Sequence, residues 1–438
     1  MVCLAATAAV ASAGQCSLLP STRTNGHDLR GVNATSAAEC CAACTNTSRC
    51  AYFTYVASRE LCWLKFDGNG GSKHDPDCTS GVAPPAPPFK CRNDQDCNYA
   101  GVCAGDECRC DPPFYGHECE QFKLYSYPPQ DGGLMIVTGN TTWGGSVVEA
   151  DDGTHHMYAA MMSGNGTLST WLSQSVVAHA VSTSGPQGPY KFSDVALGPR
   201  GDQYWDGTTC HNPDAKRTPD GLYVIYYMGS RSNHTASLEF NQRVGTAWAA
   251  SPYGPWTRSD TPIVYPGAAG KWDDGFTTNP APYVYPNGSV LLVYKARSAN
   301  NSGGMLEGVA FAPTWNSSYK KLTPDAPLDL PTDCEDAGIY RAPSGVFRML
   351  THCGCTGQYM WSLDGIHWSR TTPEQPWCTN VSYTDGSVGS LATRQRPKWY
   401  TDKTGAATLV FTGVNRPGQG GMGHTWTMAA AVTKPAAA

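Results

Sequence analysis

Apolar and polar positions along residues 125–432 follow a pattern that returns five times. In each repeat, one apolar run leads into a turn that contains glycine and a second apolar run follows, as in "LYVIYYMG" and "SVLLVYKA". Short runs of apolar, β-branched and aromatic residues bounded by turn residues predict strands. The turn glycines are Gly153, Gly221, Gly288, Gly345 and Gly405, which lie 68, 67, 57 and 60 residues apart.

A third strand follows the hairpin in most repeats and often ends in an aromatic residue, as in "VGTAWAASPYGPW" and "GQYMWSLDGIHW". A period of about 60 residues with several strands per repeat is typical of a four-stranded propeller blade. A β-sandwich would lack this regular return of strand, glycine turn and aromatic strand. We therefore predict an all-β fold, with a five-bladed β-propeller over residues 125–432.

The starts of the first strands hold the candidate chemistry. Because the first strand of a propeller blade is innermost, these positions should ring one mouth of the central channel. The ring changes from blade to blade, as a site for an asymmetric ligand would, although the same residues could simply cap the strand ends. The positions nine residues before the turn glycines are Gly144, Asn212, Asn279, Asp336 and Arg396, preceded by Trp143, His211, Thr278, Glu335 and Gln395.

Two loops and the second strands add further polar and aromatic residues to this mouth. The loops "YWDGTTCHNP" and "KWDDGFTTNP" each place a Trp and an Asp before the strand start. Carboxylates, Arg, Asn and Trp together suit sugar binding, through hydrogen bonds to hydroxyls and stacking on C–H faces. The predicted substrate-binding residues are Trp143, His211, Asn212, Asp206, Trp272, Asp273, Asn279, Arg297, His352, Arg394 and Arg396.

The cysteine content indicates an oxidising compartment. Fourteen of the nineteen cysteines fall before residue 120, a density that favours disulfides. Nine Asn-x-Ser/Thr sequons, and an apolar start over residues 1–14 that resembles a signal peptide without its basic end, also favour secretion. A net charge of −5 argues against a nucleic-acid partner, and no apolar run is long enough to span a membrane.

Residues 15–80 contain the run "AAECCAACTNTSRCAYFTYVASRELCWLKF", which predicts a short helix and then a strand pair. The segment resembles a PAN/apple domain, in which disulfides join a helix to a small sheet. Such modules bind proteins or carbohydrate, but a disulfide-held spacer fits the pattern equally well. A proline-rich stretch predicts a stiff linker over residues 81–90. The resemblance implies the bridges Cys40–Cys62, Cys44–Cys50 and Cys16–Cys78, and leaves Cys41 unassigned.

Six cysteines lie within residues 91–120, a segment too short to bury a sufficient core without disulfides. The ending "CRCDPPFYGHEC" resembles an EGF-like module, which would offer further protein or glycan contacts. The sequence alone leaves many pairings open. The resemblance implies the bridges Cys91–Cys103, Cys97–Cys108 and Cys110–Cys119.

The hairpins "NPDAKRTPDGLYVIYYMGS" and "NPAPYVYPNGSVLLVYKAR" resemble those of five-bladed propeller glycoside hydrolases, notably glycoside hydrolase family 43. That family uses an Asp general base, a Glu general acid and an Asp that orients the acid and adjusts its pKa. The resemblance implies Glu335 as the acid and Asp214 as the adjusting Asp. The first blade reads Trp-Gly-Gly-Ser where the base is expected. Its replacement would be Asp336, Asp206 or Asp273, unless the ring only binds sugar.

The preferred interpretation is a secreted glycoside hydrolase of the inverting type that acts on a polysaccharide or glycoconjugate. One alternative is a carbohydrate-binding or adhesion protein that uses the same pocket without turnover. The other is a scaffold whose small modules make protein contacts. No cofactor is expected to be required, although a ring of His and carboxylates can hold a structural calcium ion in the channel. Among the propeller cysteines, Cys210 and Cys334 are candidates for a pair.

Overall fold

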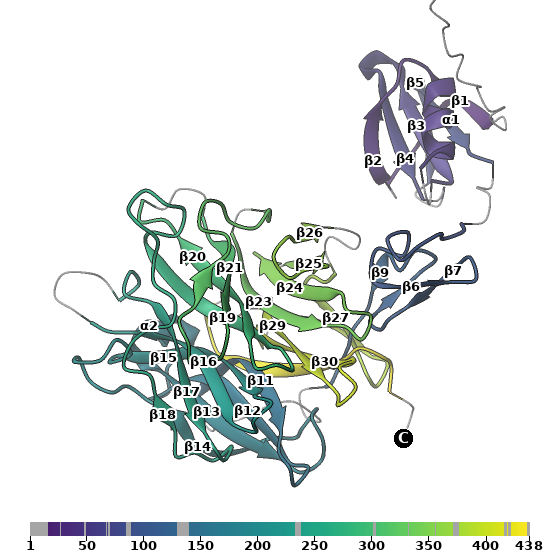
Figure 1. Cartoon of the computed structure of the whole chain (residues 1–438). Helices are drawn as coiled ribbons and strands as arrows, with labels where there is room; N and C mark the ends of the chain where they lie inside the picture. The colour runs from purple at the N-terminus through teal and green to yellow at the C-terminus, as the bar shows by residue number, and fades with distance from the viewer. Residues whose placement is uncertain are drawn as a thin grey trace, which may run out of the picture. The chain divides into compact units, whose positions relative to one another are not determined.

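The computed structural model describes residues 16–26, 28–47, 50–66, 68, 71–84, 89–128, 140–232, 238–300, 304–331, 333–354, 356–370, 376–415, 418 and 422–435. The predicted signal segment, residues 1–14, and part of the predicted linker lie outside these ranges. The chain divides into two compact units, unit 1 (Met1–Lys90) and unit 2 (Cys91–Ala438), both drawn in Figure 1. The six-cysteine segment therefore belongs to the same unit as the predicted propeller.

Unit 1 combines one helix with a five-stranded sheet of order β1-β5-β3-β4-β2. The helix α1 (Ala37–Thr45) begins where the Glu39 amide donates to the Ser36 side chain at 3.2 Å. The Glu39 carboxylate in turn accepts from the Thr35 amide at 2.7 Å, so backbone donors at the helix start are satisfied. The strands are β1 (Ser17–Thr24), β2 (Asp28–Asn33), β3 (Tyr52–Val56), β4 (Leu61–Lys65) and β5 (Ser72–Val82).

Three disulfides hold α1 in unit 1. Two predicted bridges are confirmed, Cys40–Cys62 and Cys44–Cys50. The expected Cys16–Cys78 bridge is wrong, because Cys16 bonds to Cys41 on the helix, with the Cα atoms 6.0 Å apart. Cys78 lies within β5, opposite Val56, as a buried thiol whose pKa is raised by burial. The sequence left Cys41 open because the helix presents it to the chain start, a contact that no local pattern records.

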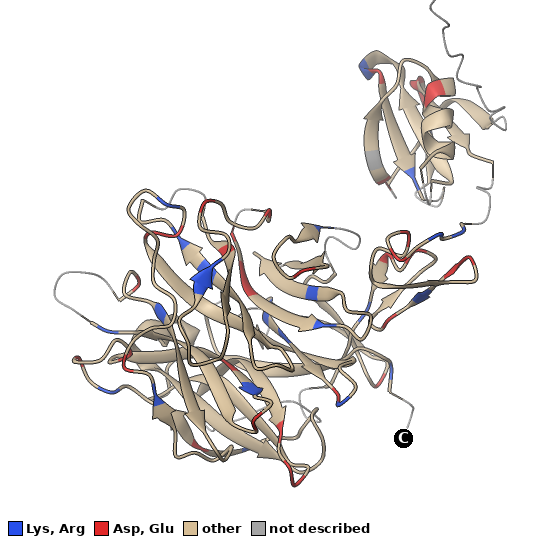
Figure 2. Cartoon of the chain, viewed as in Figure 1, with Lys and Arg blue, Asp and Glu red and all other residues tan. Residues whose placement is uncertain are grey.

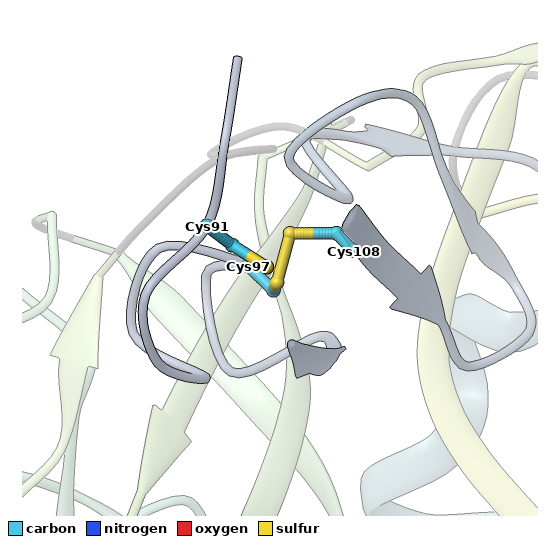
Figure 3. A group of neighbouring side chains, drawn as sticks. All are labelled: Cys91, Cys97 and Cys108. Carbon is cyan, nitrogen blue, oxygen red and sulfur yellow. A yellow bond between two sulfur atoms is a disulfide. The ribbon is translucent and has the colours of Figure 1, made fainter. Parts of the chain in front are cut away.

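The six-cysteine module, residues 91–122, consists of two small hairpins: β6 (Gly101–Ala104) with β7 (Glu107–Cys110), and β8 (Phe114–Tyr115) with β9 (Gln121–Phe122). All three predicted bridges are confirmed, Cys91–Cys103, Cys97–Cys108 and Cys110–Cys119. Three of these sulfurs lie close together, and Figure 3 shows Cys97 and Cys108 joined in a disulfide. Because Cys91 is bonded as well, this cluster offers no thiolate to a metal ion.

The six-cysteine module packs on the sheet that contains β24 (Phe347–Cys353) and β25 (Thr356–Ser362). The Phe114 ring lies 4.7 Å from the Tyr359 ring, centroid to centroid. Arg348 of β24, almost fully buried, donates to Asp111 of the module at 2.5 Å. A buried guanidinium without this partner would be costly, so the module and the sheet share one core and one ion pair between buried Arg348 and the partly exposed Asp111.

Residues 125–432 fold into five successive sheets (Figure 1). The first four sheets are β11 (Thr141–Glu149), β12 (His155–Met162), β13 (Ser175–Ser182) and β14 (Lys191–Leu197); β15 (Thr209–Arg217), β16 (Tyr223–Ser230), β17 (Arg243–Ala249) and β18 (Thr257–Arg258); β19 (Phe276–Val284), β20 (Val290–Arg297), β21 (Leu306–Ala312) and β22 (Lys320–Lys321); and β23 (Cys334–Arg341), β24, β25 and β26 (Ser369–Arg370). In every sheet two consecutive strands form the predicted hairpin: β11 with β12, β15 with β16, β19 with β20, β23 with β24 and, in the last sheet, β29 (Thr393–Thr401) with β30 (Ala407–Asn415). The turn glycine of each hairpin has φ between 80° and 90°, which glycine adopts without strain.

The last sheet closes a ring of first strands. Its order is β28-β27-β10-β31-β30-β29, and its first strand, β29, lies against β11 of the first sheet. Strand β10 precedes β11 in sequence yet pairs with β31, Tyr125 with Ala431. The start of the segment 125–432 thereby completes the sheet formed by its end. The strands are β10 (Tyr125–Ser126), β27 (Asn380–Tyr383), β28 (Val388–Ser390), β29 (Thr393–Thr401), β30 (Ala407–Asn415) and β31 (Thr425–Ala431).

The suggested Cys210–Cys334 pair is wrong. Cys334 of β23 bonds to Cys353, which stands directly opposite it on β24. Cys210 keeps a buried thiol, and burial raises its pKa to about 12. Cys334 and Cys353 meet because β23 and β24 are neighbouring strands of one sheet. Cys210 stands on β15 of a different sheet and cannot reach Cys334.

Charged residues of both signs are interspersed over unit 2 in Figure 2. Few of the described strands carry consecutive charges, in keeping with the 15% of charged residues in the chain. Within the described ranges, no helix is long and apolar enough to cross a membrane.

Candidate functional site

Each first strand has a β-bulge at the position that the sequence singled out. The pairing of β15 with β16 shifts between His211 and Asp214, and the other four first strands shift at the equivalent place. One residue at each bulge has left-handed backbone, with φ between 46° and 67°. Such backbone is strained for residues other than glycine and collects at functional sites. The five residues are Gly144, Asn212, Asn279, Asp336 and Arg396.

The bulge lets neighbouring side chains face the same way. In a regular strand, Glu335 and Asp336 would point to opposite faces of the sheet. Because Asp336 has φ of 67° at the bulge of β23, both carboxylates line one cavity.

The five bulge residues interact with one another around the channel. Asn212 Nδ2 donates to Asn279 Oδ1 at 2.8 Å, and Asn279 Nδ2 donates to Asp336 Oδ1. Arg396 Nη1 donates to the same Asp336 oxygen at 3.4 Å. The stem of Arg396 crosses Gly144, where an added Cβ would lie 2.4 Å from Arg396 Cδ. The first sheet therefore has glycine here because the arginine of the last sheet fills the space.

A cavity of about 200 Å³ lies at this ring. Six predicted residues line it: Trp143, His211, Asn212, Asn279, Glu335 and Asp336. Gln395, expected only as a strand-start neighbour, also lines it, and sequence reasoning missed Leu168, Trp171, Gln242, Lys295, Met305 and Met422. Leu168 and Trp171 stand in short helical segments and Gln242, Met305 and Met422 in loops, none of which carries a repeat signal. Lys295 had one available signal, because a lysine inside the apolar run "SVLLVYKA" needs a partner when it is buried.

One wall of the cavity is aromatic. The Trp171 and His211 rings stack with centroids 5.1 Å apart, and Trp143 lines the cavity as well. His211 Nδ1 lies 2.6 Å from Ser175 Oγ. Burial, reinforced by the charges of Arg396 and Lys295, lowers the pKa of His211 well below its usual range. His211 is therefore a neutral ring, and this wall offers flat apolar faces of the kind that stack on sugar C–H groups.

Glu335 has the more exposed side chain of the two cavity carboxylates, 29% against 6% for Asp336. Its Oε2 accepts from Lys295 Nζ, and its Oε1 lies 3.6 Å from His352 Nε2. Burial raises the pKa of Glu335, but Lys295 and His352 outweigh burial and hold the pKa below its usual range. Burial lowers the pKa of Lys295, and the charge of Glu335 more than restores it. In the free protein the pair is an ionised carboxylate held by an ammonium group.

His352 stands behind the two carboxylates and does not line the cavity. Its Nδ1 lies 3.8 Å from Asp336 Oδ2, while its Nε2 faces Glu335. The Arg396 backbone amide donates to His352 Nδ1 at 3.4 Å, so that nitrogen is an acceptor. With Nδ1 as an acceptor, His352 can donate only through Nε2, which faces Glu335.

Asp214 lies two residues beyond Asn212 and outside the cavity lining. Its carboxylate oxygens are 2.8 Å from Lys216 Nζ and 2.9 Å from Lys398 Nζ. Burial raises the pKa of Asp214, but the two ammonium groups outweigh burial and lower it. The structure thus places the candidate acid-adjusting Asp with two lysines, and not beside Glu335.

Lys398 occupies the position at which a channel cation would find oxygen ligands. Besides Asp214, its ammonium donates to the carbonyl oxygens of Ala337 at 2.6 Å and Pro280 at 3.1 Å. Carboxylate and carbonyl oxygens are the ligands that calcium requires. The Lys398 ammonium group therefore satisfies these three oxygens itself.

The Trp–Asp loops do not reach the cavity, which corrects the expectation for Asp206, Trp272 and Asp273. Asp206 is fully buried and bonds to Arg200 at 2.8 Å and to the Tyr227 hydroxyl at 2.7 Å. These contacts fix the loop to the outer part of its own sheet. The same sequence pattern therefore marks a repeated structural anchor.

The next sheet repeats this anchor. Asp273 accepts from Tyr294 at 3.0 Å and from Lys321. The Trp272 indole donates to the Thr323 carbonyl at 3.1 Å and lies over Gly308, where a Cβ would come within 2.7 Å of the ring. Equivalent partners in two sheets explain why the loops resemble each other more than ligand-binding loops of an asymmetric site would.

Arg297 and Arg394 also lie outside the cavity lining. Arg297 pairs with Glu239 at 2.7 Å and lies over the Phe276 ring. Arg394 is buried with its guanidinium 5.6 Å from the Trp377 ring centroid, and burial lowers its pKa to about 10. Both arginines support strand ends by packing on aromatic rings.

Residues 22–65 match a family model described as PAN domain. This confirms the resemblance drawn for the first module. A search of curated proteins found no match to the chain.

Solved structures resemble the chain over most of its length. A family 117 glycoside hydrolase of the marine bacterium Zobellia galactanivorans matches with a TM-score of 0.53 and 19% identity, over 73% of this chain and 91% of that one. The catalytic domain of a GH62 alpha-L-arabinofuranosidase from Coprinopsis cinerea matches with a TM-score of 0.51 and 15% identity, over 73% of this chain and 99% of that one. The fold is that of the propeller glycoside hydrolases. A further structure titled glycoside hydrolase matches with a TM-score of 0.53 and 13% identity, over 73% of this chain and 94% of that one.

Proposed function

We propose that the protein is a secreted glycoside hydrolase that binds carbohydrate in the cavity around Glu335. The observation that carries the proposal is the placement of two carboxylates, Glu335 and Asp336, beside the aromatic wall of Trp143 and Trp171 in one cavity. Amides from Asn212 and three further Asn and Gln side chains complete a lining that suits sugar hydroxyls. The fold shared with propeller glycoside hydrolases supports the same choice.

Each of the five sheets is proposed to be one blade of a five-bladed propeller. The support is the closed ring of first strands, in which β29 returns to β11. The central channel then runs past the five bulges, and the sugar cavity is the mouth at the bulge end.

Glu335 is proposed as the general acid and Asp336 as the carboxylate that replaces the missing first-blade base. Inversion requires two carboxyl groups roughly 6.5–9.5 Å apart with a water between base and sugar. An acid must carry a proton, whereas Glu335 is held ionised by Lys295 in the free protein. Catalysis therefore requires the bound sugar to weaken the Lys295 contact, which would let the pKa of Glu335 rise. Asp214 is proposed to act indirectly, through the channel lysines that surround it.

A second candidate is sugar binding without turnover. Two observations favour it: the Glu335 carboxylate already has its charge paired by Lys295, and Gly144 stands where the family resemblance implies a base. A lectin-like site needs neither a proton donor nor an activated water. The two candidates share the cavity and differ only in whether a bond is broken.

Secretion is proposed on the disulfides and the sequons. Seven disulfides lie in the described part of the chain, a number that suits an oxidising compartment. The sequon residues Asn33, Asn46, Asn316 and Asn380 are exposed, as N-glycosylation requires. We assign protein or glycan contacts to unit 1, whereas the six-cysteine module uses one face to pack on the β24–β25 sheet.

The deciding experiment is a panel of plant and algal oligosaccharides and glycoconjugates screened for both binding and hydrolysis. The proteins are the parent, Glu335→Gln, and Glu149→Gln as a matched control in a surface ion pair with Lys403. A hydrolase loses about 10²–10⁴-fold in turnover in Glu335→Gln and keeps binding, since Gln has the shape but no proton to donate. Full turnover in Glu335→Gln would falsify the acid assignment. Binding without turnover in the parent selects the second candidate.

A further inference from the structure

Glu307 is a second buried glutamate that touches the strand carrying the cavity carboxylates. It stands on β21, is 1% exposed and does not line the cavity. Its Oε1 accepts from the Ala337 amide, the residue directly after Asp336, at 3.1 Å. Thr351 Oγ1, on β24, lies 3.0 Å from the same oxygen. The Glu307 carboxyl group therefore bridges the bulge strand and its hairpin partner.

The hydrogen bonds of Thr351 indicate a proton on Glu307. Thr351 Oγ1 also contacts the Glu335 carbonyl oxygen, which can only accept. A hydroxyl group has one proton and cannot donate fully to both the carbonyl and a carboxylate. A protonated Glu307 resolves the conflict, since it donates to Thr351 and leaves the Thr351 proton for the Glu335 carbonyl.

The other carboxyl oxygen agrees with a neutral group. Glu307 Oε2 is buried and has no hydrogen-bond partner among the described residues. An ionised carboxylate with one unpaired buried oxygen is far more costly than a neutral carboxyl group. The oxygen pattern and the Thr351 contacts thus lead independently to the same protonation state.

Every neighbouring element contributes a charge or a titratable group. Lys295 stands opposite Glu307 in the β20–β21 ladder, but its ammonium group is paired with Glu335. Burial raises the pKa of Glu307 most, Asp336 raises it further, and Thr351 and His352 lower it, to give a value of about 7. The proton on Glu307 is therefore held up to neutral pH and lost above it.

We propose that protonated Glu307 is a positioning residue that holds the β23 bulge and so presents Glu335 and Asp336 to the cavity. The role of this contact in catalysis or sugar binding rests on the proposed function. The link between the Glu307 proton and the β23 bulge does not. When Glu307 loses its proton, Thr351 turns its hydrogen toward the new carboxylate and releases the Glu335 carbonyl. One proton leaves to solvent, the hydrogen bond between Glu307 and Thr351 reverses its direction, and the Glu335 carbonyl loses its donor. The bulge is then held less firmly above neutral pH.

The same proton couples to folding. Its pKa rises from 4.5 in the unfolded chain to about 7 in the folded protein, so the folded state binds more protons between these values. The stabilisation is fully present below about pH 4.5 and is lost as pH rises through about 7.

The first test is the thermal midpoint of the full chain between pH 5 and pH 8, for the parent, Glu307→Gln and the control Glu149→Gln. Gln does not titrate in this range, and its carbonyl oxygen can still accept from the Ala337 amide, so its contacts do not change with pH. As pH rises, we expect the thermal midpoint of the parent to fall by several degrees relative to that of Glu307→Gln. The midpoint of Glu149→Gln should change with pH in parallel with that of the parent. Parallel curves for the parent and Glu307→Gln overturn the proposal.

The second test follows the cavity by tryptophan emission, taken as the difference between each protein and its Trp171→Phe derivative. The parent should show a transition near pH 7 that Glu307→Gln lacks. Thr351→Val removes a contact that lowers the pKa of Glu307, so its transition should move to higher pH. An unmoved transition in Thr351→Val overturns the proposal even if Glu307→Gln fails to fold. No sugar is used, so failure here and failure of the oligosaccharide panel are separate results.

Discussion

Lys295 and Glu335 form an ion pair that joins the third and fourth sheets at the wall of the cavity. The lysine comes from the second strand of one sheet and the glutamate from the bulged first strand of the next. The pair sets the charge of the carboxylate that faces the ligand. Any chemistry at Glu335 therefore begins with a change in its contact with Lys295.

Replacing Lys295 with Met should raise the pKa of Glu335, because burial then acts without the opposing ammonium charge. The ionised Glu335 contributes stability that is present above about pH 4.5 and is lost as pH falls below that value. We expect Lys295→Met to be less stable by about 1–3 kcal/mol at pH 7. The difference from the parent should narrow below pH 4, as measured by denaturant unfolding at several pH values. A difference that stays constant with pH would contradict the pairing.

Replacing Gly144 with Ala should destabilise the ring of bulge residues. The new Cβ would lie 2.4 Å from Arg396 Cδ, at a φ of 60° that is already strained for alanine. Gly153→Ala is the matched control, since its φ of 80° is equally strained but nothing lies within 4 Å. We expect a loss of about 2–4 kcal/mol for Gly144→Ala and about 1 kcal/mol for Gly153→Ala. Equal losses in chemical denaturation would show that Arg396 does not fill this space.

Replacing Asp273 with Asn should weaken folding without changing the cavity. The substitution leaves the Lys321 ammonium without its carboxylate partner, at a cost of about 2–4 kcal/mol. Asp325→Asn, which breaks an exposed pair with Lys271, should cost less than about 1 kcal/mol. Sugar binding measured well below the unfolding temperature should match the parent in both variants. Weaker sugar binding in Asp273→Asn alone would show that this loop contributes to the ligand site.

Removing one bridge from each cysteine-rich segment should affect different units. Loss of Cys110–Cys119 should lower the unfolding temperature of unit 2, because the six-cysteine module shares a core with the β24–β25 sheet. Loss of Cys44–Cys50 should affect only unit 1. Each loss is expected to cost about 2–5 kcal/mol in its own unit. Calorimetry of the two Ser double variants is the measurement, and an unchanged unit 2 transition without Cys110–Cys119 would count against the shared core.

The sequence by itself determined the repeats, the hairpins and the turn glycines. These features are local, because a turn with positive φ selects glycine and a strand pair needs only its own apolar residues. The sequence singled out five positions as strand starts, and the structure places them at the third or fourth residue of each strand, at a bulge. The nine-residue offset therefore found Asn212, Asn279 and Asp336 at the cavity before any contact was known. The correct cysteine pairings came from the family resemblances and not from spacing, and the Cys334–Cys353 bridge within the β23–β24 hairpin was missed.

Only the tertiary structure decided which polar groups meet. Arg396 reaches across to Gly144 from the last sheet to the first, and Lys295 reaches Glu335 across a sheet boundary. The Trp–Asp loops looked like ligand loops in the sequence because no local pattern records that Tyr227 and Arg258 bury and pair Asp206. Long-range packing fixes such contacts, since the energy of a buried charge depends on neighbours that the sheet ring alone brings together.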